Sequence, residues 1–333
     1  MSRAARRRAA LNLTLALIGL LGAVLALGLG DYPLTPAQVV EALVGSDSGF
    51  ARTVVVEWRA PRVMVALAFG AALATSGALF QSLTRNPLGS PDVIGLSTGS
   101  YTGALVAMAW AGSGRLATTS GAIVGGLATA VLVYVLAHRD GVQGFRLIVV
   151  GIGVTAMLHA FNLFLLARLR EETAMTAAIW GAGSIGLIGW DRALPALAVL
   201  AALTPLTVAA APALRQLELG DDAAGGHGLR VEPARLAILA LGAALTAVVT
   251  ASAGPIAFIA LAAPQIAQRL TRSPGTPLLA SALLGGLGLL AADLAAQFVL
   301  PMAVPTGAVT VVLGGAYLVD LMIREARSDK TAR

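Results

Sequence analysis

The stretch VMVALAFGAALATSGALFQS, from Val63 to Ser82, decides what kind of fold this chain can adopt. It runs for about 20 residues without a charge, and a helix of that length, at about 1.5 Å per residue, crosses a hydrocarbon core of about 30 Å. Small residues recur along it, as they do in SALLGGLGLLAAD from Ser281 to Asp293. That pattern is typical of membrane helices that pack closely. The stretch therefore predicts a transmembrane helix surrounded by others.

The rest of the chain has the same character. Of its 333 residues, 57% are hydrophobic and 12% are charged, against roughly 25% charged residues in a soluble domain. The third, seventh and eighth hydrophobic runs are expected to be short or broken by proline. We predict an all-α membrane protein with about ten transmembrane helices. The runs cover approximately residues 11–30, 63–82, 93–110, 116–137, 147–167, 193–214, 236–253, 255–270, 278–299 and 303–323.

Missing residue types exclude several functions. The single lysine, Lys330, lies near the C-terminus, so no Gly-rich loop ending in Gly-Lys-Ser/Thr is present, and ATP-driven work must come from a partner. The absence of cysteine excludes disulfides and thiolate metal sites. A metal site made of Asp221, Asp222 and His227 would be open to water, so neither a metal nor a cofactor is expected. The net charge of +6 indicates membrane orientation in so apolar a chain, and no nucleic-acid partner is expected.

The distribution of basic residues predicts the orientation. The N-terminus MSRAARRRAA resembles the start of a signal peptide but lacks a convincing cleavage site, so 11–30 is interpreted as a retained anchor. With this end in the cytoplasm, 16 of the 23 Lys and Arg residues fall on the cytoplasmic side and 7 on the other, as the positive-inside rule requires. We expect one transmembrane domain, 11–325, in the plasma (inner) membrane, with cytoplasmic tails at 1–10 and 326–333.

The most polar interior stretch, LELGDDAAGGHGLRVEPARL from Leu217 to Leu236, falls on the cytoplasmic side of this topology. Gly220 before two aspartates, and Gly225-Gly226 after them, predict a short helix with sharp exits. Asp221 and Asp222 are expected to cap that helix and to oppose its dipole. A contact element for a cytoplasmic partner is favoured over an ordinary solvated loop.

Two pieces on the outer side are not expected to span. PLTPAQVVEALVG, from Pro33 to Gly45, combines Thr35 as N-cap with Pro36 at the first helical position and predicts a short interfacial helix. TAMTAAIWGAGSIGLIGW, from Thr173 to Trp190, is rich in small residues and fits either a half-helix at an outer opening or an inert loop.

Polar side chains inside the spans are candidates for a pathway, because facing lipid is costly for them. His159 and Asn162 are three positions apart and are expected to face one side of a helix, with Thr155 one turn before His159. Thr306 and Thr310 form a second pair, four apart. Hydrogen bonding between helices is the alternative role for each of them.

Asp293 is predicted to be the only carboxylate deep in a span. Its position suggests a proton relay, but no basic partner is evident from the spacing, so a bond to a neighbouring helix is favoured. An ion-coupled secondary transporter that uses Asp293 is the alternative function. An intramembrane enzyme is disfavoured because no intramembrane His–Asp pair is evident from the spacing, and the serines near glycines are better explained by close helix packing.

Several stretches together resemble the FecCD-type iron–siderophore and cobalamin permeases, the membrane subunits of type II ABC importers. The segments LELGDDAA and LIVVGIGVTAMLHAFN resemble the ferric enterobactin branch of this family. The stretches that carry the family resemblance are RAPRVMVALAFGAALATSGALFQSLTRNPLGSPDVIGLSTGS (59–100), AGPIAFIALAAPQIAQRL (253–270), LLAADLAAQ (289–297) and VPTGAVTVVLGGAYLVDLMI (304–323).

The resemblance implies the type II ABC importer permease fold, no enzymatic activity in this chain, and roles for particular residues. Arg59 and Arg62 are expected to face carboxylates of an extracytoplasmic binding protein, while a third docking arginine of the cobalamin importer corresponds to Gln297 here. Spans five and ten resemble pathway helices, which adds weight to His159, Asn162, Thr155, Thr306 and Thr310. The 217–235 loop is expected to form coupling helices on the ATPase, through Glu218, Leu219, Gly220, Asp221, Asp222, Ala223, Ala224, His227 and Gly228.

The expected function is import of a ferric siderophore, of catecholate type, into the cytoplasm. The implied partners are cytoplasmic ATP-binding subunits, a siderophore-binding protein on the outer side, the lipid membrane, and a second permease subunit. That second subunit is identical or similar to this chain, and a heterodimer is favoured.

Overall fold

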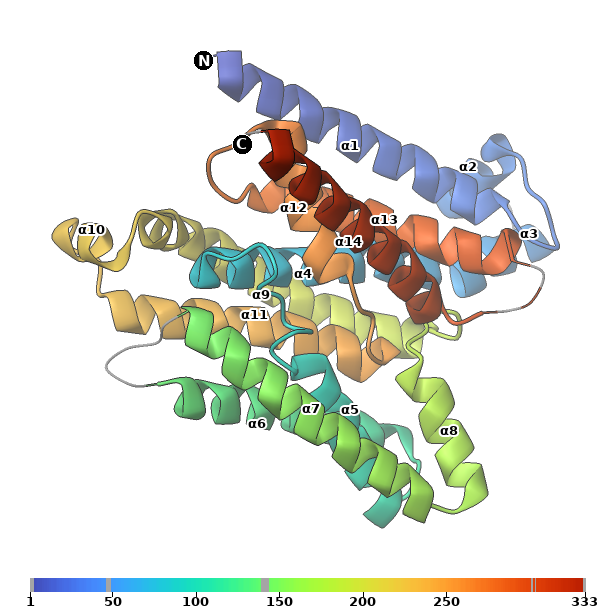
Figure 1. Cartoon of the computed structure of the whole chain (residues 1–333). Coiled ribbons are helices and arrows are strands. Elements are labelled where there is room, and N and C mark those ends of the chain that lie inside the picture. Colours follow the sequence, from blue (N-terminus) through green and yellow to red (C-terminus); the bar gives the residue numbers. More distant parts are fainter. Residues whose placement is uncertain (1–2, 46–48, 139–143, 301, 303, 332–333) are drawn as a thin grey trace.

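The computed structural model describes residues 3–45, 49–138, 144–300, 302 and 304–331, and helices dominate these residues (Figure 1). The helices, including the π-helical segment η1, are α1 (Arg3–Gly28), α2 (Pro36–Val44), α3 (Phe50–Arg52), η1 (Thr53–Arg59), α4 (Ala60–Thr84), α5 (Leu96–Trp110), α6 (Arg115–Ala137), α7 (Gly144–Arg168), α8 (Glu171–Gly181), α9 (Trp190–Glu218), α10 (Asp221–Gly226), α11 (Val231–Ala253), α12 (Ile259–Thr271), α13 (Leu278–Phe298) and α14 (Thr306–Thr331).

Each of the ten predicted spans contains a helix. Within the described residues, seven helices are long and apolar enough to cross a membrane. The other three expected spans, α5, α12 and α14, have shorter helices or a shorter apolar part. The seventh span was expected to be short, but α11 begins earlier and is full length, because the polar residues before Leu236 already belong to the helix.

The expected tails are largely helical extensions. Helix α1 begins at Arg3, inside the segment expected to be a tail, and α14 continues to Thr331. Residues 1–2 and 332–333 of the two tails lie outside the described residues.

Helix α4, which contains the opening stretch, is the most enclosed of the candidate spans. Its glycines let other helices reach its backbone: a Cβ added at Gly70 would lie 2.2 Å from the Gly285 carbonyl oxygen on α13, and one added at Gly77 would lie 1.7 Å from that of Ala260 on α12. The pair α5 and α6 uses the same device at Gly103. The prediction that small residues permit close helix packing is confirmed.

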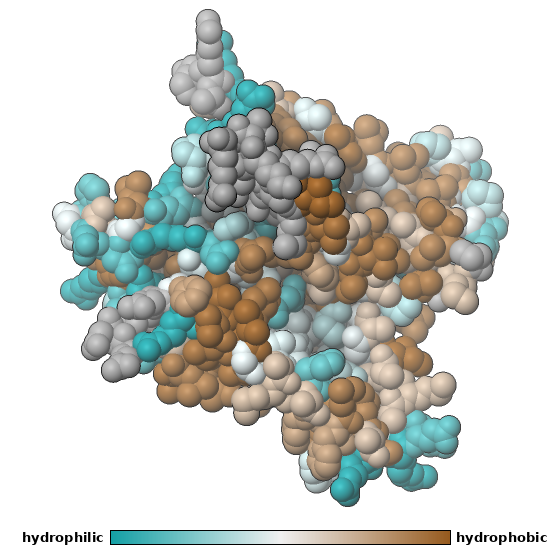
Figure 2. Space-filling view, in the orientation of Figure 1, coloured by the Kyte–Doolittle hydropathy of each residue, from teal (hydrophilic) through white to brown (hydrophobic). Residues whose placement is uncertain are grey.

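The short helices lie at the two ends of the bundle (Figure 1). Helix α10 lies at one end, together with both chain termini, whereas α2, α3 and α8 lie at the other. We call these the α10 end and the α8 end. Figure 2 shows hydrophobic side chains over the middle of this face and hydrophilic ones toward both ends, as expected for a membrane protein.

The two segments that were not expected to span have defined structures. Thr35 caps α2 in a capping box with Gln38, and Gly45 ends the helix at φ 85°, so the predicted short helix is confirmed. The stretch from Thr173 to Trp190 is helical in α8 and then turns away through non-helical residues 182–189. This linker is tied to other helices, because Ser184 N donates to Ala253 O over 2.7 Å and Gly307 N donates to Gly183 O over 2.9 Å.

Candidate functional site

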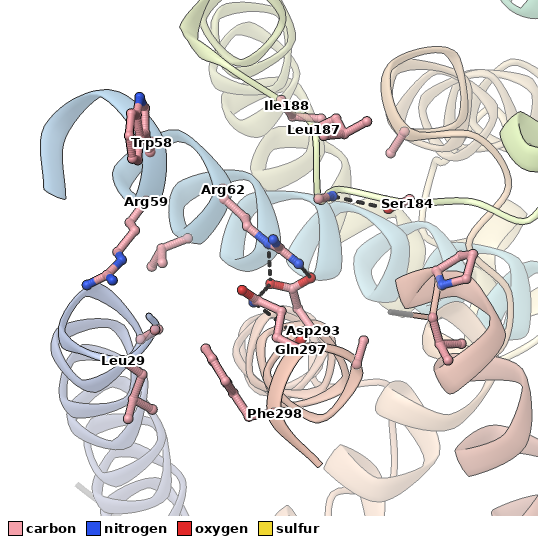
Figure 3. A pocket seen from close by; sticks show the side chains of 18 of the residues that line it. Leu29, Trp58, Arg59, Arg62, Ser184, Leu187, Ile188, Asp293, Gln297 and Phe298 are labelled. Carbon is pink, nitrogen blue, oxygen red and sulfur yellow. Dashed lines mark hydrogen bonds and ion pairs between the residues drawn. The ribbon is translucent and has the colours of Figure 1, made fainter. Parts of the chain in front are cut away.

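A cavity of about 1080 Å³ opens at the α8 end of the bundle (Figure 3). Its wall includes the end of α1, η1, the start of α4, α8, the 182–189 linker and the end of α13. Three aromatic rings follow one another along this wall. The ring centroids of Tyr32 and Phe50 are 5.4 Å apart and those of Phe50 and Trp58 are 5.7 Å apart, and both pairs meet edge to face. The cavity therefore has an aromatic wall beside several charged groups.

Arg59, at the end of η1, lines this cavity and is held by backbone carbonyls. Its Nη1 donates to Leu27 O over 2.9 Å, and its Nη2 donates to Tyr32 O over 2.8 Å. These bonds fix the guanidinium where α1 ends. Both acceptors are neutral, and the nearby carboxylate of Asp31, which lines the same cavity, acts on Arg59 through its charge without forming an ion pair within the described residues.

Arg62, one turn further along α4, forms a two-pronged ion pair with Asp293 on α13 (Figure 3). Its Nε donates to Oδ2 over 2.8 Å and its Nη2 donates to Oδ1 over 2.9 Å. Gln297 Nε2 also donates to Oδ2, over 2.9 Å, and Thr306 Oγ1 donates to Oδ1, over 2.9 Å. Each oxygen of Asp293 thus accepts two hydrogen bonds, and the group joins α4, α13 and α14.

These contacts change the picture drawn from spacing. The favoured prediction for Asp293, a bond to a neighbouring helix, is confirmed, and its basic partner is Arg62. Arg59 and Arg62 both line one cavity, as a docking role requires, but both are already engaged within the chain. Gln297, which was expected to correspond to a docking arginine, belongs to the same junction.

At the α10 end, Asp221 is a bridge and not a cap. Gly220 occupies the N-cap position of α10 at φ 113°, and no side chain caps the helix. The expected capping by the aspartates is therefore wrong, because two arginines take up the Asp221 carboxylate. Arg85 at the end of α4 donates to Oδ1 over 2.6 Å, and Arg235 on α11 donates to Oδ2 over 2.7 Å.

The charge environment of Asp221 favours its ionised form. Partial burial opposes ionisation, but the hydrogen bonds and positive charges of Arg235 and Arg85 outweigh it, so the pKa of Asp221 lies below its ordinary value. The side chain of Arg235 is only 8% exposed, whereas those of Asp221 and Arg85 are each 48% exposed. The bridge to Arg235 is accordingly better shielded from water than the bridge to Arg85.

Glu218 fixes the other side of this region. Its Oε1 accepts hydrogen bonds from Ser82 Oγ on α4 and, over 3.0 Å, from the backbone nitrogen of Thr276 before α13. The last residue of α9 is thereby tied to two other elements. Through the bonds of Asp221 and Glu218, the segment around α10 is connected to α4, α11 and the turn between α12 and α13.

The remaining residues expected in the coupling segment differ in exposure. Leu219, Asp222, His227 and Gly228 are exposed, Gly220 and Ala223 are half-buried, and Ala224 is fully buried against the body of the protein. Gly220 and Gly228 both have positive φ, at 113° and 83°, which allows the chain to turn sharply on either side of α10.

The five expected pathway residues do not form one polar surface within this chain. On α7, His159 is exposed, whereas Asn162 is 2% exposed and neither of its side-chain polar atoms has a hydrogen-bond partner. The two residues are three positions apart on one helix, as expected, but only Asn162 is enclosed by the chain. Thr155 donates to Gly151 O over 2.7 Å.

The two threonines of α14 are also turned inward. Thr306 belongs to the Asp293 junction. Thr310 is buried, donates to Gly307 O over 2.8 Å, and borders a second cavity of about 350 Å³ between α12, α13 and α14.

Asp92 is a further acid whose carboxylate is enclosed, although its spacing gave no sign of this. It lies between α4 and α5, in the 86–95 segment that leads to the start of α5. Ser97 Oγ donates to Asp92 Oδ1 over 2.7 Å, and the carboxylate also lies against the backbone of Phe258. Asp293 is thus not the only enclosed carboxylate. Within the described residues, no group of three or more His, Asp or Glu side chains could hold a metal ion.

Comparisons with known proteins agree with this arrangement. The sequence pattern of the FecCD transport family matches residues 17–324. The chain is 48% identical over 299 residues to the ferric enterobactin transport system permease protein FepG of Escherichia coli (strain K12), covering 90% of this chain and 91% of the relative. It is 35% identical over 324 residues to the achromobactin transport system permease protein CbrC of Dickeya dadantii (strain 3937), covering 94% and 91%.

A solved structure shares the fold. A chain from a metal-chelate type ABC transporter in an inward-facing conformation superposes with a TM-score of 0.82 at 25% identity, over 94% of this chain and 98% of the other.

Proposed function

This chain belongs to the FecCD transport family, and we propose that it is the permease subunit through which an ATP-driven importer carries a ferric siderophore, of catecholate type, into the cytoplasm. Its relatives are permeases of iron and siderophore transport systems. The sequence identity to FepG along most of both chains carries the proposal. The substrate is then a ferric catecholate such as ferric enterobactin.

Energy enters at the α10 end. A cytoplasmic ATPase would contact the exposed side chains of the α10 segment, and the Asp221 and Glu218 networks would pass its movement to α4, α11 and the α12–α13 turn. In this proposal both termini lie in the cytoplasm, and ten helices cross the membrane. The chain contains no cysteine, so single cysteines at Asp222 and Tyr32 would report the two sides through their accessibility to a membrane-impermeant maleimide.

A second permease subunit completes the pathway. His159 is exposed on α7 without a hydrogen-bond partner among the described residues, and a polar side chain that faced lipid would be costly. A similar chain placed against α7 and α14 would cover it and leave a route between the two subunits. We favour a heterodimer.

The ion-coupled alternative has lost the feature that suggested it. Both oxygens of Asp293 are occupied, and its charge is paired with Arg62. A proton relay needs a carboxylate that water can reach, and the Asp293 side chain is only 3% exposed.

Reconstitution tests the proposed function. The permease, its co-encoded second permease and ATPase are placed in proteoliposomes, and the co-encoded binding protein is loaded with iron-55 enterobactin. We expect uptake that requires ATP and stops with a hydrolysis-deficient ATPase. Ferrichrome and haemin serve as hydroxamate and haem comparisons. Uptake driven by a proton or sodium gradient without ATP would refute the importer mechanism, and a preference for ferrichrome or haemin would refute the substrate.

A further inference from the structure

The junction around Asp293 holds more hydrogen-bond donors than an ion pair requires. The Asp293 side chain is 3% exposed and accepts from Arg62, Gln297 and Thr306 at 2.8 to 2.9 Å. A buried carboxylate with a single partner would be left uncompensated if that partner moved, at a large cost. Here two neutral donors on α13 and α14 would remain, so Asp293 can tolerate the departure of Arg62.

Arg62 is placed differently from its partner. Its side chain is 23% exposed and lines the cavity at the α8 end (Figure 3). Only Nε and Nη2 are engaged, and Nη1 has no hydrogen bond to the residues that the structure describes. The guanidinium can therefore be reached from the cavity while it is still bound to Asp293.

The surroundings suit a carboxylate that enters from outside the chain. Arg59 and Arg192 also line the cavity, so its three arginines outnumber the two carboxylates, Asp31 and Asp293, that line it with them. Asp31 acts on Arg59 through its charge, but no ion pair joins the two within the described residues. The aromatic rings of Tyr32, Phe50 and Trp58 give the cavity an apolar wall, which strengthens ion pairing by excluding water.

We propose that Asp293 is an internal competitor for Arg62, which an acidic side chain of the siderophore-binding protein displaces when it docks in this cavity. Asp293 then stays on Thr306 and Gln297, and the ion pair that ties the start of α4 to the end of α13 is broken. This inference rests on the proposed function, because it takes the outer-side partner from it. It assigns Asp293 a positioning role: the residue sets how available Arg62 is, and it does not touch the substrate.

The Arg62–Asp293 pair is connected to the start of α14 by hydrogen bonds. Thr306 is the first residue of α14, and Gly307 N bonds Gly183 O in the linker between α8 and α9. A shift of Arg62 away from Asp293 therefore loosens the start of α14 from α4, while the bond from Thr306 is kept. Docking at the α8 end is in this way linked to the helix proposed to line the pathway.

Two substitutions separate this exchange from a merely structural ion pair, because they act in opposite directions. Asp293→Asn keeps the size of the side chain but removes the competing charge, so the binding protein should bind the detergent-solubilised importer roughly tenfold more tightly. Thr306→Val keeps the ion pair but removes one of the two donors that replace Arg62, so the binding protein should bind roughly tenfold more weakly.

The control is Asp191→Asn, which breaks the exposed Arg115–Asp191 pair at the same end of the bundle. It should leave the affinity unchanged. Affinity is measured by biolayer interferometry with the immobilised importer, and thermal unfolding of each variant shows whether it is folded. ATPase activity without binding protein should rise in Asp293→Asn and stay at the wild-type level in Thr306→Val.

The outcomes are distinct. Affinity changes of opposite sign support the exchange. If the wild type binds but both variants weaken binding, or neither changes it, Asp293 is only structural and the exchange is refuted. If the wild-type importer binds no binding protein, the proposed function fails, and the exchange falls with it.

Discussion

Replacing Asp221 by alanine should detach α10 from the body of the permease without unfolding it. The substitution removes both carboxylate bonds, to Arg85 and to Arg235. The first pair is exposed on both sides and contributes about 0 to 1 kcal/mol. The pair with Arg235 involves a largely buried arginine, and a hydrogen bond to a charged group contributes about 1.5 to 3 kcal/mol. Because the Asp221 carboxylate is half-exposed, we expect the contribution of this pair to lie near the lower of these values.

Together the two bonds hold α10 by about 2 kcal/mol, which corresponds to roughly a 30-fold change in the population with α10 released. Amide hydrogen exchange measures that population directly, because exchange of a protected amide follows local opening. The amide of Ala224, bonded to Gly220 O and carried on a buried residue, is the reporter. Its exchange should accelerate roughly 30-fold in Asp221→Ala. ATP-driven uptake should fall as well, because α10 must be fixed to transmit force.

Asp222→Ala is the matched control for the exchange measurement. It removes the same charge from the first turn of α10 and introduces the same alanine, but Asp222 forms no ion pair in the part of the chain that the structure describes. Its Ala224 exchange should match the wild type. Equal exchange in both variants would refute the bridging role of Asp221, and global unfolding of Asp221→Ala would show that the bridge supports more than α10.

Three further predictions follow from the packing and the charges. Gly77→Ala places a methyl group 1.7 Å from the Ala260 carbonyl oxygen, so it should lower the free energy of unfolding in detergent by about 1 to 3 kcal/mol or more. In the control Gly315→Ala the added methyl group meets open space, so the melting temperature should not fall. Glu218→Ala frees the α12–α13 turn from α9 and should reduce coupling, seen as ATPase activity that binding protein no longer stimulates; stimulation at the wild-type level would contradict it. The pKa of Asp221 is lower in the folded protein than its ordinary value near 3.9. Its contribution to holding α10 should therefore be fully present above about pH 3.9 and should be lost as the pH falls through the lowered pKa. Amide hydrogen exchange, corrected for its intrinsic pH dependence, should show no added release of α10 between pH 5 and 8.

Much of the fold could be predicted because membrane insertion depends on local properties. The length and apolarity of each run are enough to locate a membrane helix, and the glycines at 70, 77 and 103 show where backbones approach. The capping box of α2 is equally local, since Thr35 and Gln38 lie three positions apart. The family resemblance needed only the order of the motifs along the chain.

The candidate sites depended on contacts that spacing does not reveal. Arg62 and Asp293 are 231 positions apart, and nothing in either stretch names the other as its partner. The same holds for Asp221, which lay at the start of a predicted helix and was therefore expected to cap it. Its two arginines come from helices that only the packing of the bundle brings alongside.

From the sequence we could predict a bundle of membrane helices with a polar loop at 217–236, because hydrophobic length and small-residue spacing are properties of single helices. Which charges are already paired depends on the packing between helices, because a buried charge is stabilised where that packing supplies a counter-charge. Asp293 is therefore held by Arg62, and the largely buried Arg235 by Asp221. Those pairings, set by contacts between distant helices, determine what a partner at either end can bind.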